Sequence, residues 1–295
     1  MTEYLIPTTV EEALNLLDRN PGQALIIAGG TDVLPDLRKG RRAPQLLVDI
    51  TQIPELKRIQ VGEGLVKVGG ATTFAEIKDH PYLIRRVPAL AEAAASVGAL
   101  AIQTAATWAG NLVQAMPAAD GAVVALALEA EAQVVDTEGM NWRPVESLFL
   151  GPGRSTIDST RQIVTCIRFP IPTGPWGTAW RRIGRRPSLV LPILNCAVKV
   201  ELEGDRIGRT TVALGPVAPR PFRAVETEVF LAGKPMTPGV FEEAGQIAQG
   251  ESNPRSSVMR ASREYRLAVI PILVSDALAT ACQRAGDSAL EASDL

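Results

Sequence analysis

Apolar positions repeat with helical spacing near the start of the chain and then give way to short, continuous apolar runs. Four apolar residues between positions 13 and 17 fall on one face of a helix, which Thr8 and Glu11 begin as a capping box. The runs at 24–28 and 46–50 have the length of buried strands. The pattern predicts a small α/β unit that closes near residue 57.

The next stretch mixes strand and helix patterns in a second unit. Thr73 and Glu76 form another capping box, and an Ala-rich helical segment follows at 89–97. Asp120 stands where it can cap an apolar helix. The remaining elements of this unit are expected as strands at 65–68, 132–136 and 163–169, a helix at 121–129, and loops at 104–112 and 151–159.

A cluster of proline and glycine at 170–177 predicts a linker, and the pattern changes after it. Residues 193–202 alternate as a long strand, which Gly204-Asp205 turns into a hairpin with 210–214. Helices are expected at 225–232, 240–248 and 262–284, and Pro271 is expected to bend or split the last one. We therefore predict an α+β chain with three parts, at 1–57, 58–175 and 176–295.

Composition narrows the class of protein. The 295 residues are 46% hydrophobic and 21% charged, as in a globular protein. The net charge of -2 argues against a nucleic-acid binder, because such proteins usually have a strong basic bias. No apolar run approaches the ~20 residues of a membrane span, and the N-terminus has no signal-peptide pattern. A cytoplasmic location is expected.

The chain has too few cysteines and histidines for most metal-dependent or nucleophilic catalytic mechanisms. Cys166, Cys196 and Cys282 form no C-x-x-C pair, so no zinc or iron–sulfur signature is visible. The single histidine, His80, excludes a two-histidine metal motif and is expected as a solvated helix end. We therefore expect no metal site and no catalytic residue in this chain, and difficult chemistry here requires a cofactor.

The first motif with chemical content is the AGGTD segment at 28–32, directly after a predicted strand. Glycines let the backbone turn sharply and let amide groups face an anion, and a row of such amides can hold a diphosphate. The spacing is neither a G-x-G-x-x-G nor a P-loop pattern. An ordinary strand–turn–helix connection gives the same sequence, so the motif alone stays ambiguous.

Three further motifs are compatible with the same kind of ligand. The TWAGN segment at 107–111 combines a hydroxyl, small residues and an amide, which suits a phosphate or a ribityl chain, although a buried turn fits equally well. Asp120 can accept hydrogen bonds from sugar hydroxyls or simply cap a helix. The RRIGRR segment at 181–186 can stabilise a diphosphate or a reduced, anionic flavin, or form a solvated or partner-facing basic patch.

Taken in order, these motifs resemble one family. AGGTD after a first strand, A-T-x-x-G-N at 106–111 and Pro-x-x-Asp at 117–120 look like the FAD-binding medium subunit of the xanthine dehydrogenase and carbon monoxide dehydrogenase group. The group also includes 4-hydroxybenzoyl-CoA reductase. Towards the C-terminus, 223–234 and RASREYR at 260–266 resemble the family's R-A-V-E helix and R-x-S-x-x-Y-R signature. The resemblance extends over nearly the whole chain.

The resemblance implies an FAD domain of the vanillyl-alcohol-oxidase (PCMH) type in two parts, 1–57 and 58–175, followed by a smaller C-terminal domain at 176–295. It implies a relay of electrons between this FAD, [2Fe–2S] clusters in a small subunit and a molybdopterin site in a large subunit, in a dimer of heterotrimers. Motifs and resemblance together give these candidate cofactor-binding residues: Ala28, Gly29, Gly30, Thr31, Asp32, Val33, Thr107, Ala109, Gly110, Asn111, Asp120 and Arg185.

The sequence departs from the family pattern at a few positions. Gln103-Thr104 precede the Ala-Thr pair where Arg-Asn is common, and Trp108 replaces an aliphatic residue. The Cys-rich insertion that some reductases of the group carry is absent, since residue 111 runs directly into Pro117 and Asp120.

Two other functions remain open from the sequence. A self-contained FAD-dependent oxidase on the same kind of FAD domain needs an acid or base in the C-terminal part, and nothing there stands out. A non-catalytic interaction protein that has lost FAD is disfavoured by the intact glycines and Asp120.

Overall fold

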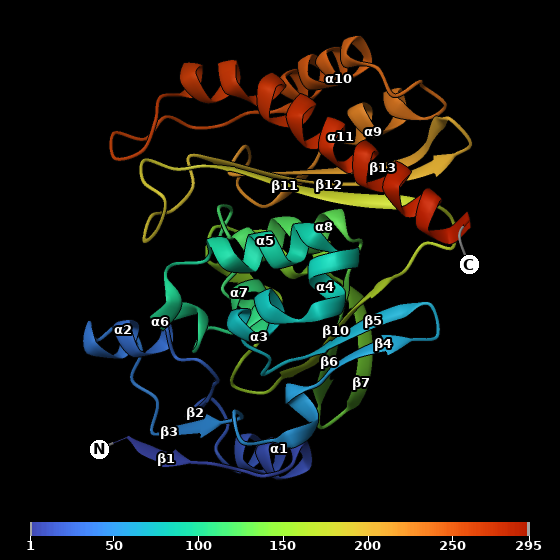
Figure 1. The fold of residues 1–295 in the computed structure, drawn as a ribbon. Helices are drawn as coiled ribbons and strands as arrows, with labels where there is room; N and C mark the ends of the chain where they lie inside the picture. Colours follow the sequence, from blue (N-terminus) through green and yellow to red (C-terminus); the bar gives the residue numbers. More distant parts are fainter. Residues whose placement is uncertain (1, 294–295) are drawn as a thin grey trace.

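The computed structural model describes residues 2–293, with side chains described to residue 288, and the chain forms three stacked layers (Figure 1). The N-terminal layer is a three-stranded parallel sheet in the order β1-β3-β2. Its own core is formed by residues such as Ala13, Leu17 and Val48. The elements of this layer are β1 (Glu3–Leu5), α1 (Val10–Arg19), β2 (Ala24–Ile27), α2 (Val33–Arg38), β3 (Leu46–Asp49) and the 3-10 helix η1 (Pro54–Lys57).

The cap of α1 lies one residue later than predicted. Thr9, not Thr8, is the N-cap and accepts a hydrogen bond from the Glu12 amide at 3.1 Å. The Glu12 carboxylate accepts from the Thr8 amide at 2.8 Å, so Glu12 takes the part that was expected of Glu11. The chain offers two adjacent threonines and two adjacent glutamates, and the extended backbone at Thr9 selects the second pair.

The middle layer is a five-stranded antiparallel sheet in the order β4-β5-β10-β6-β7, with helices on one face (Figure 1). Two of its strands, β4 and β7, were not predicted. Its strands are β4 (Ile59–Gly62), β5 (Leu65–Gly69), β6 (Glu131–Asp136), β7 (Gly139–Pro144) and β10 (Ile163–Pro170). Its helices are α3 (Phe74–Asp79), α4 (Pro81–Arg86), α5 (Pro88–Ser96), α6 (Leu100–Gln103), α7 (Trp108–Val113), α8 (Asp120–Ala127) and η2 (Val145–Leu148).

Two expected loops of this layer contain regular structure. The run predicted as loop at 104–112 contains most of α7, because the Thr107 hydroxyl caps the helix by accepting from the Gly110 amide at 3.1 Å. The helix is too short for its apolar period to stand out in the sequence. The run at 151–159 contains part of a small hairpin, β8 (Phe149–Gly151) with β9 (Arg154–Ser155).

The C-terminal layer is a four-stranded antiparallel sheet with α9, α10 and α11 on its outer face (Figure 1). The predicted hairpin at Gly204-Asp205 is confirmed by the pairing of β12 with β13. The predicted linker ends at Trp176, where the unpredicted strand β11 begins. The elements are β11 (Trp176–Ile183), β12 (Leu194–Glu203), β13 (Arg206–Gly215), β14 (Phe222–Arg223), α9 (Val225–Leu231), α10 (Pro238–Glu251) and α11 (Arg263–Ser293).

Helix α11 is continuous through Pro271, so it is not split there. Its segment 263–288 is long and apolar enough to cross a membrane by length and composition alone. In this fold its buried residues, including Ile270, Val274 and Ala277, pack into the core of the C-terminal layer. The apolar composition of α11 is therefore explained by its contacts with the sheet and α10.

Helix α8 lies between the middle and the C-terminal layers, and all eight of its residues are buried. Trp176 and Trp180 of β11 belong to the same core cluster as α5 and α8. The buried Lys199 of β12 is 2.7 Å from the Glu129 carboxylate just after α8. Packing and ion pairing thus join the C-terminal sheet to the helices that support the candidate site.

Candidate cofactor site

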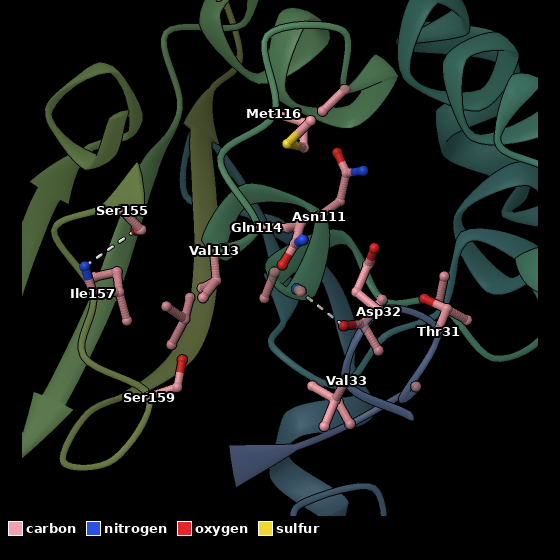
Figure 2. Close-up of a pocket in the computed structure, with 18 of the residues that line it drawn as sticks. Thr31, Asp32, Val33, Asn111, Val113, Gln114, Met116, Ser155, Ile157 and Ser159 are labelled. Atoms are coloured by element: carbon pink, nitrogen blue, oxygen red, sulfur yellow. Dashed lines mark hydrogen bonds between the residues drawn. The ribbon is translucent and has the colours of Figure 1, made fainter. Parts of the chain in front are cut away.

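One large pocket lies beside the two glycine-bearing segments that the sequence singled out. Its volume is about 890 Å³, within the range of pockets that hold cofactors. Residues from three segments form its walls (Figure 2): 28–33 after β2, 106–119 around α7, and 150–162 after η2. Ten of the twelve candidate residues line it, and Asp120 and Arg185 do not.

The first wall is the turn between β2 and α2. Gly30 has a φ of +65°, a conformation that favours glycine, and its preceding neighbour Gly29 approaches the second wall closely. A Cβ on Gly29 would lie 1.9 Å from the carbonyl oxygen of Ala105. Only a residue without a side chain lets the two walls meet in this way.

The amides of this turn are free to bind a ligand. Within the described part of the chain, no hydrogen bond engages the amides of residues 29–33, and all five residues line the pocket. The turn precedes α2, and the positive φ of Gly30 gives successive amides the concave arrangement that binds anions. Thr31 adds a hydroxyl at the same edge (Figure 2).

Asp32 is the acidic member of the first wall. Burial raises the pKa of its carboxyl above the ordinary value, and the nearby Asp36 raises that pKa further, while Arg42 lowers it. Asp32 is the N-cap of α2, yet its side chain makes no capping hydrogen bond. Its carboxylate therefore remains available to hydroxyl or ring N–H donors of a ligand.

The second wall is built on α7. Thr107 caps this helix, and the amides of Trp108 and Asn111 donate to backbone carbonyls at 3.3 and 3.1 Å. Trp108 is fully buried, and its indole Nε1 donates to the Gly121 carbonyl at 2.8 Å. Asn111 Oδ1 is buried without a partner among the described residues. This wall therefore presents side chains and small residues rather than a row of free amides.

The third wall was missed by the sequence reasoning, which expected residues 151–159 as a surface loop. Figure 2 shows Ser155, Ile157 and Ser159 across the pocket from Thr31 and Asp32. The Ser159 carbonyl accepts from the Ile26 amide at 3.0 Å, which fixes this segment beside β2. A high content of serine, threonine and glycine was the available signal, but it is shared by ordinary surface loops.

Asp120 occupies a different place from the one expected. It begins α8 as a helical residue, and Ala119 is the N-cap. Its carboxylate accepts from Asn195 Nδ2 at 2.6 Å and from Arg182 Nε at 3.3 Å. Burial raises the pKa of Asp120 to about 6, although Arg182 and Asn195 oppose the shift. The side chain thus binds the C-terminal sheet, and its neighbours Ala118 and Ala119 line the pocket.

The arginine cluster at 181–186 is also used within the fold. Arg181 pairs with Asp276, and Arg182 bridges Asp120 and the Val190 carbonyl. Arg185 lies outside the pocket and donates from Nε to the Arg260 carbonyl at 3.2 Å. The C-terminal layer instead contributes Leu191 and Arg260 to the pocket.

These features fit a dinucleotide cofactor and give no sign of a metal. Five free amides after a strand suit a diphosphate, and the pocket beside them is also lined by residues of the middle and C-terminal layers. Among residues 2–288, whose side chains are described, no group of three or more histidine, cysteine or acidic side chains is placed to hold a metal ion. Fold and pocket together define a protein that binds a nucleotide cofactor between α/β layers.

Comparison with known proteins gives the family. A model described as the FAD binding domain in molybdopterin dehydrogenase matches residues 1–172, and the CO dehydrogenase flavoprotein C-terminal domain matches 179–281. The chain belongs to this family of FAD-binding subunits of molybdenum-containing dehydrogenases. The FAD prediction is therefore confirmed, as is the predicted resemblance.

Individual relatives cover almost the entire chain. The putative xanthine dehydrogenase FAD-binding subunit of Escherichia coli (strain K12) is 30% identical over 284 residues, which are 96% of this chain and 97% of the relative. The carbon monoxide dehydrogenase of Hydrogenophaga pseudoflava has a similar structure, with a TM-score of 0.89 at 28% identity over 96% of this chain and 98% of that one. Quinoline 2-oxidoreductase of Pseudomonas putida 86 gives 0.88 at 26% identity, over 97% and 98%.

Proposed function

We propose that this chain is the FAD-binding electron-transfer subunit of a molybdenum-containing hydroxylase or dehydrogenase. It passes electrons between iron–sulfur clusters of a partner subunit and an external acceptor or donor. The observation that supports this most is the turn at 28–33, whose free amides border a dinucleotide-sized pocket, while the described residues form no cluster that could hold a metal ion. Bound FAD supplies the redox chemistry, and the protein supplies binding and orientation.

The residues of the pocket have separate tasks in this proposal. The amides of residues 29–33 hold the diphosphate, and Thr31 and Asp32 bind neighbouring hydroxyl groups. Thr107, Ala109, Gly110 and Asn111 form the facing wall. The apolar residues around them exclude water. Asp120 holds the wall formed by residues 116–119 against the C-terminal sheet, in place of the direct contact expected from the sequence.

The assembly and architecture follow from the same proposal. We assign 1–57 and 58–175 to a two-part FAD domain of the vanillyl-alcohol-oxidase (PCMH) type and 176–295 to the C-terminal domain. The partners are an iron–sulfur small subunit and a molybdopterin large subunit, in a cytoplasmic dimer of heterotrimers. A permanent interface of this kind buries roughly 2,000 Å² or more. Gentle native purification is expected to yield partner chains, and a monomer as the sole species contradicts the assembly.

FAD binding is tested directly on the isolated chain. The purified protein is expected to be yellow and to release FAD, not FMN, on denaturation. Gly30→Val is expected to reduce flavin content strongly, because valine does not tolerate a φ of +65° and its Cβ would lie 3.1 Å from the Ile27 side chain. Gly62→Val is the control, since a Cβ there meets nothing within 4 Å. Equal flavin content in both variants would refute the assignment of the turn.

The relay role is tested by asking where organic substrates react. The FAD-replete chain is mixed anaerobically with xanthine, carbon monoxide, glyceraldehyde and nicotinate, which the names of its relatives mention. We expect persistent yellow with all four and bleaching by dithionite. Bleaching by one of these compounds without partner subunits would favour the self-contained oxidase.

A further inference from the structure

Arg260 is a cation of the pocket wall without an anionic partner. It precedes α11, lines the pocket and is partly buried. Among the described residues, no hydrogen bond or ion pair engages its guanidinium group, whereas the arginines at 181, 182, 209 and 223 all contact acidic side chains. Burial and the nearby Arg255 both lower the pKa of Arg260. A positive charge in this position lacks the compensation that buried charges usually have.

The backbone holds Arg260 in place beside the pocket. Its amide donates to the Ser257 carbonyl at 3.1 Å, and its carbonyl accepts from Arg185 Nε at 3.2 Å. Arg185 lies in the loop between β11 and β12, and Leu189 of that loop donates from its amide to the Gly98 carbonyl at 2.9 Å. Gly98 itself lines the pocket. The loops at 184–193 and 252–262, both in the C-terminal layer, therefore contact each other, and each contributes a residue to the pocket, Leu191 and Arg260.

The pocket is lined on one side by the N-terminal layer, through residues such as Leu25 and Ile50, and on another by the C-terminal layer, through Leu191 and Arg260. Leu25 and Ile50 are 6 and 3% exposed. Leu191 is 54% exposed, and Arg182 joins the carbonyl of its neighbour Val190 to Asp120 beside the 116–119 wall. A ring that exchanges electrons with partners needs a short path to the surface. The side of the pocket formed by Leu191 and Arg260 is accordingly the place for the isoalloxazine ring, and the side formed by the N-terminal layer is the place for adenosine.

We propose that Arg260 is a flavin-binding residue that contacts the pyrimidine edge of the isoalloxazine ring and stabilises its anionic, two-electron-reduced form. The proposal rests on the FAD binding proposed above. Two electrons, from the iron–sulfur partner or from dithionite in a test, and one proton convert the neutral ring into a form with one negative charge. That charge is the anion that Arg260 lacks, and a guanidinium suits it because both groups are planar.

The sequence pointed to this role but to another arginine. The cluster at 181–186 suggested a cation for reduced flavin, and Arg185 was the candidate. In the fold, Arg185 supports the backbone of Arg260 instead. The sequence did not show that Arg260, and not Arg185, lines the pocket, because the two loops come together only in the folded protein.

The test compares Arg260→Met and Arg260→Lys with Arg255→Met, measured on the FAD-replete chain. Arg255 has the same charge and lies close by but does not line the pocket. Arg260→Met is expected to lower the affinity for reduced relative to oxidised FAD about tenfold, which lowers the two-electron midpoint potential by about 30 mV. Arg260→Lys is expected to restore most of this, and Arg255→Met to cause a much smaller shift. The reduced flavin of Arg260→Met is also expected to lose its ring proton at higher pH.

The outcomes separate the possible roles. Equal loss of affinity for oxidised and reduced FAD, with the potential unchanged, would place Arg260 on the diphosphate and overturn the proposal. A lower melting temperature of Arg260→Met without a change in midpoint potential would mean that Arg260 has only a structural role, and this result would also overturn the proposal. Equal shifts of the midpoint potential in Arg260→Met and Arg255→Met would show that any nearby positive charge has the same effect, and this result would contradict a direct contact with Arg260. If the native chain binds no FAD at all, the proposed function itself is refuted. This outcome is recognised by the absence of flavin absorbance in the visible spectrum.

Discussion

The two glycine-bearing walls of the pocket look alike in sequence and differ in structure. AGGTD at 28–32 and TWAGN at 107–111 both combine small residues, a threonine and a polar side chain. In the first, the amides of residues 29–33 have no partner among the described residues. In the second, the Thr107 hydroxyl and carbonyl already accept from the amides of Gly110 and Asn111. The amides of the first wall are free to bind an anion, whereas those of the second wall are already hydrogen-bonded at the start of α7.

The difference shows that glycine and threonine do not identify an anion site by themselves. Thr107 stands immediately before a helix, where its hydroxyl satisfies an amide that would otherwise be free. Thr31 stands before Asp32 and α2, and its hydroxyl makes no such bond. Whether the helix amides are capped internally decides whether a ligand can use them.

The largest effect is expected where the two walls touch. Gly29→Ala would place a Cβ 1.9 Å from the Ala105 carbonyl oxygen, so one backbone must move. We expect at least about tenfold weaker FAD binding and a destabilisation of roughly 1–3 kcal/mol. Equilibrium titration with FAD and denaturant unfolding measure the two effects. Gly62→Ala is the matched control, and similar results for both variants would show that the walls do not depend on this contact.

A smaller effect is expected from removing the N-cap of α7 in the second wall. Thr107→Val keeps the shape of the side chain but removes the cap, which costs about 1 kcal/mol and about 2–4 °C in melting temperature. FAD affinity should fall less than in Gly29→Ala, because the diphosphate lies on the first wall. Thr107→Ser keeps the hydroxyl and should behave like the native chain. If Thr107→Val weakens FAD binding more than Gly29→Ala does, the roles of the two walls are reversed.

The smallest effect on FAD binding is expected at Asp120, where the prediction concerns how stability depends on pH. The folded pKa of Asp120, about 6, is raised above the unfolded value of about 3.9. A carboxyl of this kind binds more protons folded than unfolded, so its contribution to stability grows as pH falls from 7 towards 4. Relative to Asp120→Asn, the native chain should gain stability over this range. Parallel unfolding curves across these pH values would mean that Asp120 titrates normally.

Many local signals were read correctly, apart from the cap of α1 and the short helix α7, whereas signals that depend on distant partners were missed. The turn at 28–33 was predicted because strand, glycines and helix follow one another directly. The Thr73 capping box and the hairpin at Gly204-Asp205 are equally local, and the structure contains both. By contrast, Arg260 and Ser159 reach the pocket only through folding. Arg260 begins the segment that resembles the R-x-S-x-x-Y-R signature, but nothing in that pattern indicated a place in the pocket, and no pattern marked Ser159.

Asp120 illustrates the intermediate case. Its position before an apolar helix correctly indicated where α8 begins, but the sequence suggested a cap or a cofactor ligand. The actual partners, Arg182 and Asn195, lie on β11 and β12 and follow it by 62 and 75 residues. Burial against that sheet, and hence the raised pKa, cannot be read from the neighbours of Asp120 in the chain.

The burial of α8 on every side has a consequence for how the chain folds. A helix that is buried on every side has no face for water, so it is stable only after the C-terminal sheet and the helices α5 and α7 have packed around it. Loss of the C-terminal layer would remove Trp176 and Trp180 from this core cluster and expose α8, and a fragment ending near residue 175 is therefore expected to aggregate. Heating should therefore release flavin and change tryptophan fluorescence in a single cooperative transition. The cofactor would be lost through global unfolding rather than through local opening of its pocket.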